Sequence, residues 1–424
     1  MSRRPVGGEV IRRMLDREDM VALDRSDPLA VIRGKFDLPE GIIYLDGNSL
    51  GPLPCAVPER LNQVIHQQWR GDLIKSWNIH GWMNLPHKVG DQIAPIIGAN
   101  PGEVLAGDST SDNLFKLMAA ALDQRPGRKV IVSQSENFPT NNYLAEGLIH
   151  FMGQGHDLCL VDGNDVLEAI DEKVALVSLT HVNYRTGYVQ DMAAVTRRAH
   201  EAGALMLWDL SHSAGALEVD LNGANVDFAV GCTYKYLNGG PGAPAYLFVA
   251  NRLQDQVRQP LSGWQGHASP FEFEVGYRPG PGIVRQRCGT PSILAMSALD
   301  AALEVFDQVD MADIRAKSLS LTDNFIAVME QRCAGHGFTL STTREHDRRG
   351  SQVSWRHEMG YPIMQAIIAE GVIGDFRAPN ILRFGFTPLY LRHVDIWDAV
   401  SVIEDVMTSR RWDQPQFHQR APVT

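Results

Sequence analysis

Two stretches decide the fold: Ala204-Leu-Met-Leu-Trp-Asp-Leu-Ser-His212 and, shortly after it, Val226-Asp-Phe-Ala-Val-Gly-Cys-Thr-Tyr-Lys235. Each contains a short apolar run that is typical of a buried strand, and each carries a chemically active side chain beyond that run, Asp209 in the first and Lys235 in the second. Open sheets of parallel strands bind ligands at the carboxyl ends of their strands. We therefore expect Asp209 and Lys235 at one edge of a sheet, within a single site.

The segments around these stretches predict an α/β fold. From about Val130 to Phe248, short apolar runs alternate with helical patterns, which favours successive βα units and a mostly parallel sheet. The segment from Asp191 to Gly203 has both ends of a helix marked, by an N-cap carboxylate and a terminal glycine. We expect strands at Lys129–Ser133, Val174–Thr180, Ala204–Asp209, Asp227–Gly231 and Ala245–Val249.

The pattern changes after Asn251. A loop rich in glycine, proline and aromatic residues runs from Leu261 to Thr290, and helical patterns follow at Ser292–Phe306 and Met311–Cys333. The rest predicts a compact α+β domain with strands at Gln352–Trp355 and Ile381–Gly385 and helices at Tyr361–Glu370 and Val394–Met407. We expect three parts: a helical arm over 1–40 that packs on the domains, a large α/β domain over 41–310 and a small C-terminal α+β domain over 311–424.

Length and composition narrow the classes of function. A chain of 424 residues is too long for one hydrophobic core, and a net charge of −11 argues against nucleic-acid binding. Five scattered cysteines, an odd number without metal-like spacing, favour a reducing compartment and neither zinc nor disulfides. Charged residues follow Arg3-Arg4 where a signal peptide would be apolar, and no run is long enough for a membrane span. We expect a cytoplasmic enzyme without a metal.

The pairing of Asp209 with Lys235 indicates pyridoxal 5'-phosphate (PLP). This cofactor needs an anion for its pyridinium nitrogen and an amine for a Schiff base. Taken alone, Asp209 could instead cap a helix or pair with a surface arginine, and Lys235 could be a solvated surface residue. The tyrosines beside Lys235 and the glycines at 239, 240 and 242 make that segment too apolar and glycine-rich for an ordinary surface loop.

Two further segments are candidates for cofactor contacts. Gly107-Asp-Ser-Thr110-Ser111-Asp-Asn113 precedes a helical run, Leu114–Leu122, and a helix N-terminus with hydroxyls at its start can bind a phosphate. The alternative is a plain capping segment.

Phe138-Pro139-Thr140-Asn141 follows a strand, so the phenyl ring could lie over a flat cofactor. The alternative is that this ring packs in the hydrophobic core.

These motifs resemble one family, the kynureninases, which are PLP-dependent enzymes of fold type I related to class V aminotransferases. The resemblance implies a large domain with a mostly parallel seven-stranded sheet between helices and a smaller α+β C-terminal domain. It covers nearly all of the chain from about residue 25 onward. The matching blocks are Tyr44-Leu-Asp-Gly-Asn-Ser-Leu-Gly51, Ser76-Trp77, Asn137-Phe-Pro-Thr140, Thr180-His-Val-Asn-Tyr184, Trp208-Asp-Leu-Ser-His212-Ser-Ala-Gly215, Gly231-Cys-Thr-Tyr-Lys-Tyr-Leu-Asn-Gly-Gly-Pro-Gly242, Leu261-Ser-Gly-Trp264-Gln-Gly-His267 and Leu382-Arg-Phe-Gly-Phe-Thr-Pro-Leu-Tyr390.

The resemblance also implies roles for individual residues. The catalytic residues are Lys235, which carries the Schiff base, Asp209, which pairs with the pyridine nitrogen, and Tyr234, which either relays protons or only binds the phosphate. Trp264 is implied to come from the partner subunit of a homodimer with a shared site. The other implied cofactor contacts are Thr110, Ser111, Phe138, Pro139, Thr140, Asn141, Thr180, His212 and Thr290, and the implied substrate contacts are Arg383, which grips the α-carboxylate, with Asn48, Ser49, Trp77, His267 and Thr290. Asn141 departs from the aspartate that relatives often carry there, and we expect it to tune activity.

The implied reaction is hydrolysis of the Cβ–Cγ bond of L-kynurenine to anthranilate and L-alanine in tryptophan degradation, with 3-hydroxy-L-kynurenine as an alternative substrate. A cysteine desulfurase would need an exposed nucleophilic cysteine, for which Cys333 is the candidate, and an aminotransferase is a second rival. A nicotinamide enzyme would need a GxGxxG fingerprint, which Asn238-Gly-Gly-Pro-Gly242 lacks. A PLP-fold regulator fused to a DNA reader would need a longer extension than residues 1–24.

Overall fold

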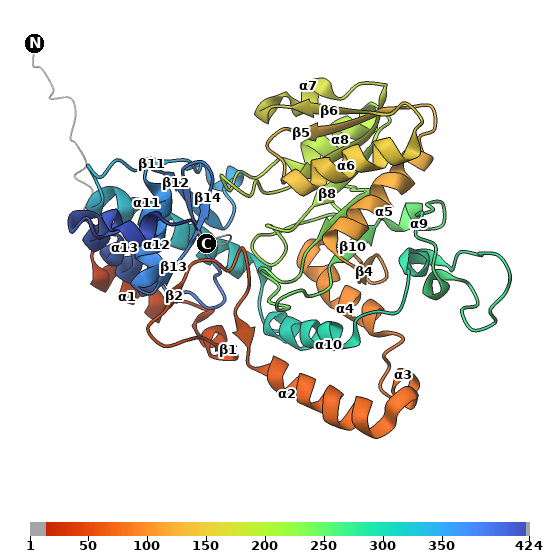
Figure 1. Ribbon diagram of the computed structural model, residues 1–424, viewed down its shortest axis with the longest axis horizontal. Coiled ribbons are helices and arrows are strands. Elements are labelled where there is room, and N and C mark those ends of the chain that lie inside the picture. The colour runs from red at the N-terminus through yellow and green to blue at the C-terminus, as the bar shows by residue number, and fades with distance from the viewer. Residues whose placement is uncertain (1–13, 421–424) are drawn as a thin grey trace, which may run out of the picture.

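A seven-stranded sheet forms the centre of the larger part of the molecule (Figure 1). The computed structural model describes residues 14–420, so the start of the expected arm, residues 1–13, lies outside the described residues. Four neighbouring strand pairs of the sheet are parallel, whereas β10 is antiparallel to both of its neighbours. In spatial order the strands are β4 (Val104–Ala106), β10 (Tyr246–Val249), β9 (Phe228–Gly231), β8 (Leu205–Asp209), β7 (Val174–Thr180), β5 (Val130–Gln134) and β6 (Asp157–Val161).

All five strands expected in this region are present, within about one residue at each end, and the mostly parallel α/β fold is confirmed. Their side chains alternate between the two faces of the sheet, as strand geometry requires. In β8, Leu205 and Leu207 pack into one apolar cluster, whereas Met206 and Trp208 pack into another. The sheet is therefore covered on both faces, which is why its central strands are apolar throughout.

Helices from different parts of the sequence cover the two faces of the sheet. On one face lie α5 (Thr110–Asp123) and α6 (Pro139–Met152), and on the other lie α4 (Leu85–Ile93), α8 (Met192–Glu201) and α10 (Ile293–Ala302). The expected cap of α8 is present, because the Asp191 side chain accepts a hydrogen bond from Ala194 N. Two short helices, α7 (Val166–Ala169) and α9 (Asn251–Gln254), complete this part.

The C-terminal part is built on an antiparallel sheet. Its strands follow the order β11 (Thr339–Leu340), β12 (Gln352–Arg356), β15 (Ile381–Gly385) and β14 (Asp375–Arg377). The helices of this part are α11 (Met311–Arg332), α12 (Gly360–Ala369) and α13 (His393–Thr408), whose apolar side chains form one core with the sheet. The strands and helices expected here are present, with ends displaced by about one residue.

Residues near the start of the described chain pack on this C-terminal part. Helix α1 (Arg17–Arg25) contacts α13, and β2 (Ile43–Tyr44) pairs in parallel with β13 (Val372–Ile373). A second short pair joins β1 (Phe36–Asp37) to β3 (Leu53–Pro54). The division into parts at residues 40 and 310 stays a prediction, although β2 shows that the chain just after residue 40 is hydrogen-bonded to the C-terminal part.

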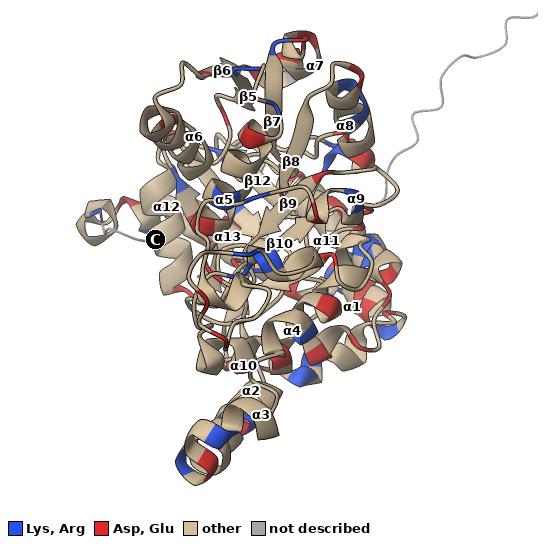
Figure 2. Ribbon diagram, turned by 90° about the vertical axis from the view of Figure 1, so that its right-hand side faces the viewer, with Lys and Arg blue, Asp and Glu red and all other residues tan. Residues whose placement is uncertain are grey.

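An arm that the sequence analysis did not predict extends away from the rest of the chain in both views (Figures 1 and 2). It consists of α2 (Ala56–Gln63), a π-helical segment over Val64–Asp72 and α3 (Ser76–Ile79). Several of its apolar side chains are largely exposed, among them Trp69, Leu73, Ile74 and Ile79. Basic and acidic residues are interspersed over the face seen in Figure 2. Within residues 14–420, no helix combines the length and apolar character needed to cross a membrane.

Candidate active site

Asp209 and Thr180 are the last residues of the neighbouring strands β8 and β7, so both lie at the carboxyl edge of the sheet. Asp209 is buried, and its Oδ2 accepts a hydrogen bond of 2.9 Å from the side-chain amide of Asn141 in the first turn of α6. Its Oδ1 accepts one of 2.9 Å from the backbone N–H of Ser211. Neutral donors therefore fix this carboxylate, and no salt bridge to Asp209 occurs among the described residues.

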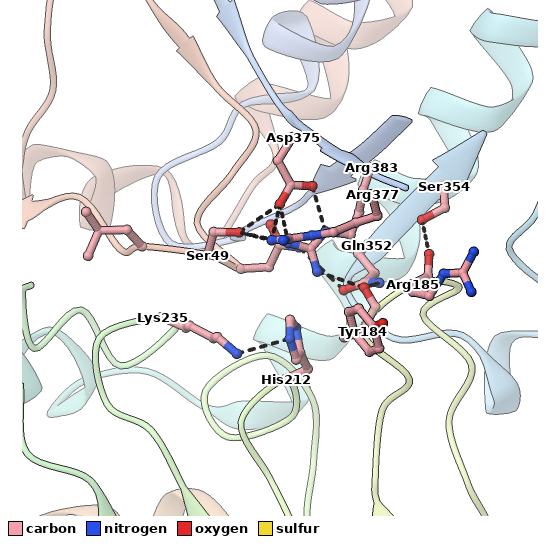
Figure 3. Close-up of polar contacts among 12 residues, drawn as sticks. Ser49, Tyr184, Arg185, His212, Lys235, Gln352, Ser354, Asp375, Arg377 and Arg383 are labelled. Atoms are coloured by element: carbon pink, nitrogen blue, oxygen red, sulfur yellow. Dashed lines mark hydrogen bonds and ion pairs between the residues drawn. The ribbon is translucent and has the colours of Figure 1, made fainter. Parts of the chain in front are cut away.

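Lys235 follows β9 and reaches the same edge. Its Nζ lies 3.1 Å from Nε2 of His212, which follows β8 (Figure 3). Burial, and then the positive charges of Lys235, Arg383 and Arg377, hold the pKa of His212 well below its ordinary value. The imidazole is therefore neutral, and its Nε2 can accept a hydrogen bond from Lys235. The other ring nitrogen, Nδ1, is buried without a partner.

The N-terminus of α5 opens at this edge too. Strand β4, which leads into α5, runs in the same direction as β9, because both are antiparallel to β10. Ser109 caps α5 in a capping box with Asp112, and Thr110 and Ser111 are the first two helical residues. The positive end of a helix dipole and free N–H groups therefore face the region where the expected phosphate would bind.

Phe138 and its neighbours enter from the loop between β5 and α6. Phe138 is the N-cap residue of α6, with Pro139 and Thr140 as the next two residues, and it is 42% exposed. The ring of Tyr184 meets it edge-on, with 5.3 Å between centroids. An exposed ring face beside the sheet edge is consistent with stacking on a flat cofactor.

A second polar cluster faces Lys235 and His212 from the C-terminal part (Figure 3). Arg383 on β15 is almost fully buried; its Nε donates to Oδ1 of Asp375 at 2.8 Å, and its Nη2 also contacts the Asp375 carboxylate. Nη1 of Arg383 donates to the carbonyl oxygen of Tyr184 at 2.7 Å, and Nη2 donates to the hydroxyl of Ser49 at 2.8 Å. Arg377 on β14 contacts the same carboxylate, at 2.5 Å.

The segment Asp46–Gly51 lies between this cluster and Lys235. Gly51 N donates to the carbonyl oxygen of Tyr234 at 2.7 Å, and a Cβ at Gly51 would lie 2.4 Å from the carbonyl oxygen of Lys235. Only glycine fits such an approach. In the orientation that satisfies its amide, Asn48 accepts from Arg383 Nε at 3.2 Å and donates to Asp46 at 3.2 Å. Burial, together with the negative charge of Asp375, raises the pKa of Asp46 to about 7.

Apart from Tyr234, the remaining predicted residues form no hydrogen bond or ring contact with Lys235 that the structure describes. Trp77 on α3 packs edge-on against Trp82. Trp264 packs against Phe271 and shares a separate cleft with His267. Thr290 lines a cleft of about 280 Å³ beside Gly107 and Asp108. Tyr234 is closer: its ring centroid lies 5.8 Å from Lys235 Nζ, and its pKa is raised by the neighbouring Cys232 and by burial.

Sequence reasoning missed three charged residues of the second cluster, Asp46, Asp375 and Arg377. A signal was available, because Asp375-Phe-Arg377 places an acid and a base on one side of a strand, two residues apart. For the desulfurase alternative, Cys333 is buried, and burial raises the pKa of its thiol to about 12. Such a thiol is a poor nucleophile.

Solved structures define the class of the fold. The chain is similar to an apo cysteine desulfurase from Thermococcus onnurineus NA1, with a TM-score of 0.76, 18% identity and coverage of 89% of this chain and 98% of that one. A C-DES mutant with glycine covalently linked to the PLP cofactor gives a TM-score of 0.75 at 15% identity, with coverage of 88% and 99%. The fold is therefore that of the PLP-dependent enzymes of fold type I.

Sequence comparisons give the family. Residues 314–403 match the model of the kynureninase C-terminal domain. Kynureninases from Burkholderia pseudomallei (strain 1106a) and Burkholderia mallei (strain SAVP1) are 55% and 54% identical to this chain, and one from Pseudomonas fluorescens is 52% identical. Each match covers 97% of this chain and 100% of the relative. The chain belongs to the kynureninase family.

Proposed function

We propose that this chain is a PLP-dependent kynureninase, which hydrolyses L-kynurenine to anthranilate and L-alanine in tryptophan degradation. The observation that carries the proposal is full-length identity of 52–55% to kynureninases in a chain that brings Asp209 and Lys235 to one sheet edge. Formation of anthranilate and L-alanine from L-kynurenine requires cleavage of the Cβ–Cγ bond. PLP, when bound, can accept the electron pair that this cleavage releases.

The side chains present fit PLP. Only neutral groups donate hydrogen bonds to Asp209, so no cation of the protein competes with a pyridinium nitrogen for this carboxylate. Lys235 forms no salt bridge among residues 14–420, and its described partner is the neutral ring of His212. The unpartnered Nδ1 of His212 is a buried polar atom that a bound group could satisfy. Thr110 and Ser111 at the start of α5 would hold the phosphate, and Phe138 would cover the ring.

Each residue then has a task in the reaction. Lys235 would hold the cofactor, and after the substrate amine replaces it, its free amine would move the proton at the substrate α-carbon. Arg383 would hold the α-carboxylate and so orient the bonds at that carbon. Tyr234 would give and take protons while water adds to the γ-ketone. Its raised pKa keeps the phenol protonated, which a proton donor requires.

The second part of the proposal is a homodimer with shared sites. An apolar groove of about 680 Å³ runs between the N-terminal segment, α2 and α10, lined by Leu38, Ile42, Leu53, Val57, Leu61 and Leu294 among others. The arm exposes further apolar side chains, including Trp69 and Ile74. Surfaces of this kind mark protein interfaces. A second copy would also explain why Trp77, Trp264, His267 and Thr290 lie away from Lys235, because they could serve the partner's site.

Complementation tests the shared site. Trp264→Ala and Lys235→Ala are each expected to be nearly inactive. When the two variants are mixed under conditions that allow subunit exchange, one site of each mixed dimer has both wild-type residues, so activity returns. Sedimentation of wild-type protein gives the mass of the particle independently. A monomer in sedimentation, or an exchanged mixture without recovered activity, would contradict the shared site.

Product analysis tests the activity. Purified protein incubated with L-kynurenine is expected to release anthranilate and L-alanine in equal amounts, and to show the yellow absorbance of bound PLP. Release of sulfide from L-cysteine without kynurenine cleavage would favour a desulfurase instead. The ratio of kcat/KM for L-kynurenine and 3-hydroxy-L-kynurenine then decides the preferred substrate.

We also place the enzyme in the cytoplasm, on the basis that all five cysteines are free.

A further inference from the structure

Arg383 has little hydrogen-bonding capacity left for a substrate. A guanidinium group has five N–H donors. In Arg383, Nε–H and one N–H of Nη2 bond Asp375, the other N–H of Nη2 bonds Ser49, and one N–H of Nη1 bonds the Tyr184 carbonyl. A single N–H remains, whereas a carboxylate is held best by two parallel N–H donors. Arg383 alone therefore cannot bind a substrate carboxylate through two parallel hydrogen bonds.

Arg377 has the donors that Arg383 lacks. Its Nη2 bonds Asp375 at 2.5 Å and Ser49 more weakly at 3.4 Å. Its Nε is buried without a hydrogen-bond partner, and none of the described hydrogen bonds involves its Nη1. The side chain is 37% exposed, so a ligand can reach it. Figure 3 shows both guanidinium groups on the side of Asp375 that faces Lys235 and His212.

The charge of the cluster suits one carboxylate. Because the raised pKa of Asp46, about 7, keeps that carboxyl largely protonated at lower pH, two arginines and Asp375 leave one positive charge there. Both guanidinium groups also lower the pKa of His212, so the cluster lies near Lys235 and His212 (Figure 3). An amino acid whose amine binds beside Lys235 must place its carboxylate a few bonds away. Asp375 also keeps the two like charges together, since guanidinium groups without a shared anion repel each other.

We propose that Arg377 is a second binding residue for the substrate α-carboxylate, and that Asp375 is a positioning residue that aligns Arg377 and Arg383. The Ser49 hydroxyl donates to Asp375 at 3.0 Å and accepts from both arginines, so it contacts all three charged groups. This inference rests on the proposed function, because it assumes an α-amino acid substrate.

The test measures how each variant distinguishes an amino acid from its decarboxylated amine. Dissociation constants are measured from the absorbance change on rapid mixing, before any L-kynurenine is consumed, for L-kynurenine and for the amine that lacks only the α-carboxylate. Wild-type protein is expected to prefer the amino acid strongly. In Arg377→Ala this preference falls by about tenfold or more while affinity for the amine is unchanged, and Arg377→Lys restores part of it.

Matched variants separate binding from folding. Arg356→Ala removes an exposed arginine of the neighbouring strand β12, whose described hydrogen bond goes to Ser341, and is expected to keep the wild-type preference. Asp375→Asn is expected to lower the preference at least as much as Arg377→Ala, with the amine again bound as before. A steady-state comparison should show higher KM in Arg377→Ala with a smaller change in kcat.

Two results would overturn the proposal. Wild-type preference in Arg377→Ala would limit Arg377 to its ion pair with Asp375. An equal loss of affinity for amino acid and amine would show a general structural defect. Failure of the proposed function is a different result: wild-type protein would not cleave L-kynurenine, yet the preference ratio would still report whether Arg377 binds the carboxylate.

Discussion

Asp209 and Asp375 are both buried carboxylates of one candidate site, but their partners differ. Asp209 accepts hydrogen bonds from an amide and a backbone N–H, so its negative charge is not neutralised by the protein. Asp375 lies between Arg377 and Arg383, so its charge is more than neutralised. The surroundings of Asp209 therefore suit a bound cation, and the cluster around Asp375 suits a bound anion. A pyridinium ring and an α-carboxylate are the matching groups in the proposed reaction.

Among the variants that test this difference between Asp209 and Asp375, removal of Asp209 should have the largest effect on activity. We expect Asp209→Ala to weaken cofactor retention and slow α-proton exchange on the order of 10²-fold or more, because the ring loses the anion that stabilises its protonated nitrogen. Absorbance after dialysis and exchange of the α-proton in heavy water measure these effects. Asp227 is an equally buried carboxylate that precedes strand β9, and Asp227→Asn should lower stability without releasing the cofactor. Unchanged α-proton exchange in Asp209→Ala would remove the assigned role.

Removing Arg383 tests the second cluster, the one around Asp375, as the binding site for the α-carboxylate. In Arg383→Ala we expect KM to rise by about 10–100-fold with a smaller fall in kcat, because charge-assisted hydrogen bonds to the carboxylate are lost. Asp375 keeps Arg377 as a partner, so the buried charge is not left alone. Steady-state kinetics with L-kynurenine provide the measurement. Wild-type KM would mean that the α-carboxylate binds elsewhere.

Asn141 offers a finer test of how Asp209 is held. Asn141→Ala removes one of two neutral donors to Asp209, so we expect cofactor affinity to fall by about tenfold, as for loss of one hydrogen bond to a buried charged group. Titration of the apoenzyme with PLP measures this affinity. Tyr143→Ala changes an exposed residue of the same helix and should have no effect. Equal affinity in Asn141→Ala and wild type would mean that Ser211 N–H suffices.

The smallest expected effect concerns Asp46 and pH. Its folded-state pKa of about 7 lies above the ordinary value of 3.8, so between these pH values the folded state binds more protons than the unfolded state. This group therefore stabilises the fold most at low pH, and its contribution is lost as pH rises toward 7. Asp46→Asn should lose less stability than wild type between pH 5 and about 7.5 in urea unfolding. A parallel pH dependence in both proteins would contradict the shift.

The sequence predicted the first cluster better than the second, for a physical reason. Asp209 and Lys235 follow apolar runs that mark strand ends, and parallel strands bring such ends together. The cluster around Arg383 joins segments near residues 49, 184 and 375, whose meeting depends on long-range packing that no local pattern reveals. Edge strand β6 was missed although Leu158–Val161 is an apolar run of four residues; unlike the central strands, it is only partly buried. Strand β4 was missed because it has only three residues.

The pairing of β2 with β13 has a consequence for synthesis of the chain. Residues 43–44 leave the ribosome early, but their hydrogen-bonding partners, residues 372–373, leave it near the end. The segment after β2 carries Ser49, which bonds Arg383, and it approaches the Lys235 carbonyl closely at Gly51. The strand pairing that positions this segment therefore forms only when translation is almost complete. A chain terminated before residue 372 lacks the β2–β13 pairing as well as Arg377 and Arg383, so it cannot assemble a working catalytic centre.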